Sequence, residues 1–133
     1  MTKKVAILPC TGMGQVVGTI ARQIGYRVCD DLRPDKTLLV CLPALVKGVQ
    51  EDIDYISQNP VVVIEGCKNY CATYALELKG ANPALTVFIP DFLKKTKIKV
   101  KREARRNLRK EELEVVEVCA KEVVRCVDEL LRG

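Results

Sequence analysis

VVVIEGCKNYC, residues 61–71, joins an apolar run of strand length to a glycine and two cysteines. Four consecutive β-branched residues, 61–64, are typical of a strand that is buried on both faces, as in parallel sheets. Glu65 and Gly66 end the apolar pattern. A strand followed by a Gly-Cys turn and a helical pattern brings its thiol to the carboxyl edge of a sheet, where open α/β folds bind ligands. The sequence therefore predicts Cys67 at that edge.

Three other runs have the character of strands: VAILP (5–9), TLLVC (37–41) and TVFIP (86–90). Helical patterns separate the four runs, the first from residue 16 to about Asp30 or Leu32, the others over 49–56 and 71–78. Such alternation predicts an α/β fold, a small three-layer parallel sheet of about four strands, flavodoxin-like or half-Rossmann. The strand order stays open, and 2-1-3-4 is the commonest order for so short a wound sheet.

The length of 133 residues, 48% of them apolar, fits one domain over residues 1–133. No apolar stretch approaches the roughly 18 residues of a membrane span, and MTKKVAILPC has no signal-peptide pattern. We therefore expect a cytoplasmic protein without a membrane partner. Its seven cysteines should be reduced, which favours metal binding or thiol chemistry over disulfides. Because the chain has no histidine, the usual general base of a Ser or Cys hydrolase is missing.

Four of the cysteines follow strand ends. Cys10, Cys41 and Cys67 each come at the end of a predicted strand, and Cys71 follows Cys67 after three residues. Because the carboxyl ends of parallel strands meet at one edge of the sheet, we expect the four thiols to converge there. If a helix begins in the loop after Gly66, Cys67 and Cys71 lie on the same face of that helix. Thiolates are preferred ligands of tetrahedral zinc, and the sequence predicts a zinc site of these four residues. An iron-sulfur cluster is the alternative, although the spacing matches neither familiar ferredoxin pattern.

The remaining cysteines are expected to pack as small apolar residues. Cys119 and Cys126 lie seven residues apart on one side of a predicted C-terminal helix, and Cys29 lies near the end of the first helix.

VAILPCTGMG, VCLPALVKG and VVVIEGCKNYC occur in this order, and together they resemble the DGC domain, a family described as zinc-binding and named for an Asp-Gly-Cys motif. The resemblance covers residues 3 to 90 and implies that the chelating cysteines are Cys10, Cys41, Cys67 and Cys71. Glu65 stands where the family name has aspartate. The resemblance implies metal binding and leaves any enzymatic activity open. A closed four-cysteine site favours metal sensing, storage or delivery over hydrolysis.

Two other interpretations of the loops that contain Cys10 and Cys67 stay open. A thiol redox or sulfur-transfer enzyme would use Cys67 as nucleophile and Cys71 as resolving thiol, beside Lys68, although redox motifs have two intervening residues. Gly12-x-Gly14-x-x-x-Gly18 is one residue longer than the dinucleotide-binding fingerprint. We interpret these glycines instead as a tight turn behind Cys10, with backbone amides directed at the thiolates.

The C-terminal third suggests further partners. Residues 94–110, the basic segment, hold ten Lys or Arg and one acid, which gives this segment a charge of +9 and the rest of the chain −4. Nucleic acid is a partner to consider, but no aromatic residue is interleaved for base stacking, and a solvated loop is the simpler interpretation. From Glu111 onward a heptad pattern predicts a long amphipathic helix that packs on the sheet or forms the seam of a homodimer. Its apolar positions are Leu113, Val116, Ala120, Val123, Val127 and Leu130.

Overall fold

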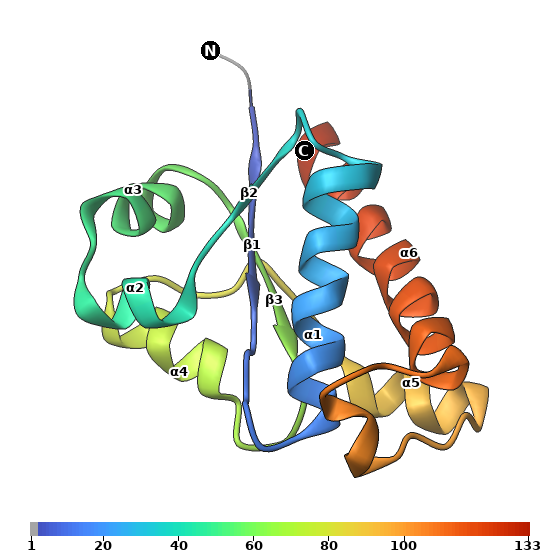
Figure 1. The fold of residues 1–133 in the computed structure, drawn as a ribbon. Helices are drawn as coiled ribbons and strands as arrows, with labels where there is room; N and C mark the ends of the chain where they lie inside the picture. Colours follow the sequence, from blue (N-terminus) through green and yellow to red (C-terminus); the bar gives the residue numbers. More distant parts are fainter. Residues whose placement is uncertain (1–2) are drawn as a thin grey trace.

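A computed structural model describes residues 3–133 as a parallel sheet between two layers of helices (Figure 1). The strands are β1 (Val5–Pro9), β2 (Thr37–Leu39), β3 (Val61–Glu65) and β4 (Leu85–Phe88). They lie in the order β2-β1-β3-β4, and every pair is parallel. The predicted α/β class is confirmed, and the order is the one typical of short wound sheets.

The centre of the sheet is the most apolar part of the chain. Every residue of β1 and β3 is buried, and Ala6 lies opposite Val61 while Leu8 lies opposite Val63. Because helices cover both faces, these strands have no polar face to alternate with, as their sequences predict. By contrast, β2 is a three-residue edge strand with two half-buried residues, so the prediction of a buried strand over 37–41 was too long.

Within residues 3–133, six α-helices surround the sheet: α1 (Val16–Tyr26), α2 (Leu42–Lys47), α3 (Gln50–Gln58), α4 (Cys71–Leu78), α5 (Ile89–Thr96) and α6 (Lys110–Arg132). In Figure 1, α2, α3 and α4 lie on one side of the sheet, and α1 and α6 lie side by side on the other. A π-helical turn, η1 (Arg27–Leu32), continues α1, and a 3₁₀ turn, η2 (Arg102–Arg105), lies between α5 and α6.

Two of these helices were not predicted. Both α2 and α5 begin directly after a strand region and carry proline in their first turn, Pro43 and Pro90. Proline fits this position because its fixed φ suits a helix and its missing N–H would have no partner in the first turn. The strand predicted over 86–90 therefore ends at Phe88, and its last two residues, Ile89 and Pro90, begin α5.

The long C-terminal helix was predicted, and α6 packs on α1 and the sheet. Four of its six predicted apolar positions are buried in the core: Val116, Ala120, Val123 and Val127. Leu113, another of the six apolar positions, is 50% exposed, whereas the preceding Glu112 is fully buried. Glu112 is buried because it forms an ion pair with Arg109, a contact that a heptad pattern does not predict.

The core also contains Cys119 and Cys126, as expected for cysteines that pack as apolar residues. Burial is the main cause that raises the pKa of Cys119 to about 12, and it raises the pKa of Cys126 as well. Both therefore stay protonated at neutral pH. Cys29 is half-buried, and burial raises its pKa to about 11. Among residues 3–133, no helix is both long and apolar enough to cross a membrane.

Candidate functional site at the carboxyl edge of the sheet

The four cysteines singled out in the sequence all lie at the carboxyl edge of the sheet, the lower end of the strands in Figure 1. Cys10 directly follows β1 and is 7% exposed. Cys41 is exposed and forms the N-cap of α2, just after β2. Cys67 is half-buried in the turn after β3, and Cys71 is the exposed first residue of α4. All four are free thiols carried by three adjacent strands and the helix that follows.

The turn between Cys67 and Cys71 differs from the prediction. Because α4 begins only at Cys71, the two residues do not share a helix face. The backbone N–H of Tyr70 donates to the carbonyl of Cys67 at 3.3 Å, and Tyr70 adopts a left-handed conformation with φ 52°. Such a conformation is costly for a bulky residue. The Tyr70 ring stacks on Phe88 at a centroid distance of 5.4 Å, a contact that helps to hold the turn.

Cys10 has the most distinctive surroundings of the four. Burial is the largest influence on its thiol and raises its pKa, and the charges of Glu65 and Cys71 raise it further. The backbone amides of Gly12 and Gly66 act in the opposite direction, because they hydrogen-bond to and stabilise the thiolate. Cys10 is therefore protonated at neutral pH and lies within electrostatic reach of Cys71.

The glycine loop after Cys10 is held against α1. A Cβ atom at Gly18 would overlap the carbonyl group of Gly12, so only glycine allows this close approach of loop and helix. A Cβ at Gly66 would lie 3.1 Å from Val17. These two close contacts bring the amides of Gly12 and Gly66 to the thiol of Cys10, in agreement with the interpretation of the glycines as a turn behind that residue.

Glu65 is a site residue whose role the sequence did not reveal. It ends β3 with no exposed surface, and its carboxylate accepts hydrogen bonds from the backbone N–H and the hydroxyl of Thr73, both at 2.7 Å. The N–H of Ala72 adds a longer bond of 3.4 Å. Glu65 thus anchors the first turn of α4, where the helix dipole favours a negative charge. Two signals were present in the sequence, an acidic residue at the end of an apolar strand and its position at the aspartate of the Asp-Gly-Cys motif, but neither indicated that the carboxylate binds the start of α4.

The family model of the DGC domain matches residues 6–123. The chain belongs to this family. The match extends over all four strands and into α6, well beyond the three cysteine-containing blocks. No curated protein and no solved structure matches the chain.

The four cysteines at the carboxyl edge of this DGC domain have the chemistry that zinc requires. All four are free thiols, and thiolates are soft ligands that zinc prefers. Within residues 3–133, no group of three or more Cys, Asp or Glu side chains is close enough together to hold a metal ion in the structure. Of the other three thiols, Cys71 is the one whose charge contributes to the raised pKa of Cys10.

The basic segment of this DGC domain is more ordered than the solvated loop expected from its charge. It contains the last turns of α5, η2 and the first residue of α6. Ala104 is buried, and η2 packs on α1. Two hydrogen bonds fix this contact: the guanidinium of Arg105 donates to the carbonyl of Gly14 at 2.8 Å, and the hydroxyl of Thr19 donates to the carbonyl of Arg105 at 2.7 Å.

Proposed function

We propose that this DGC domain is a cytoplasmic metal-binding protein that holds zinc through Cys10, Cys41, Cys67 and Cys71. The observation that carries the proposal is the placement of the four free thiols: three adjacent parallel strands run into them at one edge of the sheet. Reduced thiols belong to a reducing compartment, which supports the cytoplasm. Four thiolate ligands leave no position for a reactive water, which favours metal sensing, storage or delivery over hydrolysis.

The four residues would contribute differently. Cys10 is fixed on β1, mostly buried and protonated at neutral pH, so its proton must leave when it becomes a ligand. The amides of Gly12 and Gly66 are in place to stabilise the thiolate that results. Cys41 and Cys71 are exposed, and we propose that they and Cys67 close toward Cys10 when the ion binds. Affinity should therefore fall as the pH is lowered.

The test is the metal content of protein purified without oxygen, measured by elemental analysis together with a visible spectrum. We expect about one zinc per chain, the amount that one closed four-thiolate site holds. Serine at any of the four edge cysteines should sharply reduce the zinc content, because a neutral hydroxyl replaces a thiolate. Cys119→Ser and Cys126→Ser are the matched controls, since both thiols are buried in the core on α6 and do not follow a strand, and they should keep the zinc.

Other outcomes identify other functions. Iron with visible absorption would indicate an iron-sulfur protein. Loss of disulfide exchange in the Cys67 and Cys71 variants alone, with unchanged metal content, would indicate a thiol redox enzyme. A folded, metal-free protein in which the four edge thiols titrate freely would refute the metal-binding proposal.

A further inference from the structure

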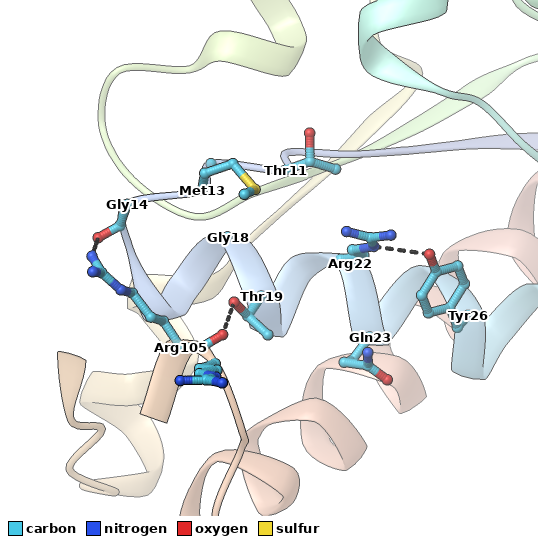
Figure 2. Close-up of a pocket in the computed structure, with 11 residues that line it drawn as sticks. Thr11, Met13, Gly14, Gly18, Thr19, Arg22, Gln23, Tyr26 and Arg105 are labelled. Atoms are coloured by element: carbon cyan, nitrogen blue, oxygen red, sulfur yellow. Dashed lines mark hydrogen bonds between the residues drawn. The ribbon is translucent and has the colours of Figure 1, made fainter. Parts of the chain in front are cut away.

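A groove lies across the exposed side of α1, and none of the residues that line it is one of the four proposed zinc ligands. It has a volume of about 630 Å³ and runs between the glycine loop, residues 11–14, and the basic segment at Arg105 and Arg106 (Figure 2). Gly18 and Thr19 form part of its lining, and Arg22 and Tyr26 lie further along the same helix. Three arginines therefore face one groove, and none of the described residues that line it is acidic.

The positive charge of these arginines is not neutralised within residues 3–133. Arg22 donates to the hydroxyl of Tyr26 at 2.8 Å, and Arg105 donates to the carbonyl of Gly14, so both use uncharged acceptors. Neither they nor Arg106 forms a salt bridge with a described residue. Carboxylates pair instead with the arginines at positions 27, 33, 109 and 125. The groove thus contains three guanidinium groups that have free donors for an anion.

The groove is also held in place before any ligand arrives. The hydrogen bonds between Arg105 and both Gly14 and Thr19 tie its two walls together (Figure 2). The positions where a Cβ would stand at Gly12 and Gly14 have no atom within 4 Å, so a ligand can approach the backbone there. Such preorganisation reduces the entropy that binding costs.

A second, mainly apolar cavity of about 400 Å³ continues the groove. Both cavities are lined by Thr11, Met13, Arg22 and Tyr26. The second one extends over the side chains of the β2–α2 region as far as Cys41. Its apolar lining consists of Pro9, Leu39, Val40, Leu42 and Pro43 together with Met13. The combined groove therefore has a cationic end and an apolar end.

We infer that this groove binds a small phosphate ester, with the phosphate among Arg22, Arg105 and Arg106 and the organic group over Leu39 and Leu42. Forked guanidinium donors match phosphate oxygens, and three of them suit a dianion better than a single carboxylate. A small ligand fits better than nucleic acid, because only two of the ten cationic residues of the basic segment line the groove. The inference goes beyond zinc binding, and none of the three arginines is a proposed zinc ligand.

Phenyl phosphate is a suitable probe because it has both parts of the expected ligand. We would titrate it into isotope-labelled full-length protein and follow backbone amide shifts by NMR, with inorganic phosphate and phenol as the two half-ligands. Phenyl phosphate should bind more tightly than either half, with shifts confined to residues of the two cavities. Arg106→Gln should weaken its binding about tenfold, the loss expected for one charge-assisted hydrogen bond.

Lys99→Gln is the matched control, because Lys99 is an exposed cation of the same segment that lies outside the lining of the groove. It should leave the affinity for phenyl phosphate unchanged. Equal weakening by Lys99→Gln and Arg106→Gln would overturn the inference in favour of a diffuse basic surface, and so would tighter binding of a thymidine oligonucleotide that depends on both residues. Equal affinity for phenol and phenyl phosphate, or no binding at all, would also refute it. A protein without zinc should still bind phenyl phosphate, so the two proposals fail separately.

Discussion

Glu65 and Glu112 are both fully buried carboxylates, but their surroundings differ. Glu112 forms an ion pair with Arg109 at 2.6 Å and also accepts hydrogen bonds from the backbone N–H groups of Lys101 and Arg109, both at 3.0 Å. Glu65 forms no salt bridge with a described residue and depends on the N–H groups and the hydroxyl at the start of α4. One carboxylate is held by a cation and the other by a helix N-terminus.

The difference matters because each glutamate positions one of the proposed sites. Burying a carboxylate is costly unless hydrogen bonds or a partner charge compensate, so each one imposes a fixed arrangement on its partners. Glu65 ties β3 to the start of α4 and thereby fixes the helix turn that begins at Cys71. Glu112 ties Lys101 to Arg109 and closes the intervening chain, which carries Arg105 and Arg106. The position of Cys71 at the carboxyl edge thus depends on hydrogen bonds from uncharged groups to Glu65. The position of Arg105 and Arg106 in the groove depends on the ion pair between Glu112 and Arg109.

The largest effect is expected from Glu112→Ala. This change leaves the N–H of Lys101 and part of the Arg109 guanidinium without their acceptor, and we expect it to lower the free energy of unfolding by about 3 kcal/mol. Urea denaturation measures the loss. Glu114→Ala, two residues along the same helix and exposed, is the control and should change stability by less than about 0.5 kcal/mol. Similar losses in both variants would show that the buried pair does not support the basic segment.

Regular patterns made the framework of the fold predictable. The continuous apolar runs of β1 and β3 indicate strands covered on both faces, and their position between helical patterns indicates a parallel sheet. The same reasoning placed cysteines at the strand ends, because a parallel sheet brings all carboxyl ends to one edge. The helical spacing of Val116, Val123 and Val127 likewise predicted a long amphipathic helix, and these three residues are buried in the core.

What the patterns missed depends on contacts between distant or irregular segments. The short α2 was hidden because Pro43 suggests a turn as readily as a helix start. A hydrophobicity pattern predicts that glutamates such as Glu65 and Glu112 are exposed. Their burial is explained only by their partners Thr73 and Arg109, which the pattern does not reveal. The arginine groove was missed for the same reason, since it forms only when η2 packs on α1.

A smaller loss is expected from Glu65→Gln, on the order of 1–2 kcal/mol. Glutamine keeps the shape of the side chain, but it can accept hydrogen bonds through only one of its two terminal atoms, so one donor at the start of α4 loses its partner. Hydrogen exchange of the Ala72 and Thr73 amides should become faster, while the amides around Lys101 should be unaffected. Thr73→Val, which removes only the hydroxyl donor, is the matched variant and should cost no more than Glu65→Gln.

The smallest effect is expected in the pH dependence of stability. It distinguishes the ion pair of the buried Glu112 from a pair in which both side chains are partly exposed. The hydrogen-bonded guanidinium of Arg109 is the main cause that lowers the pKa of Glu112 from 4.5 to about 2. Because the folded-state pKa is the lower one, this stabilisation is complete above about pH 4.5 and is lost as the pH falls toward 2. Between about pH 5 and about pH 3, only part of that loss is reached, and the unfolding free energy of the wild type should fall more steeply than that of Glu112→Gln.

Asp128→Asn is the control. Arg33 also lowers the pKa of Asp128, but both side chains are about a third exposed. Because solvent screens this pair, the slope should change less. Parallel curves for the wild type and Glu112→Gln would mean that the ion pair with Arg109 does not set the acid stability of this region.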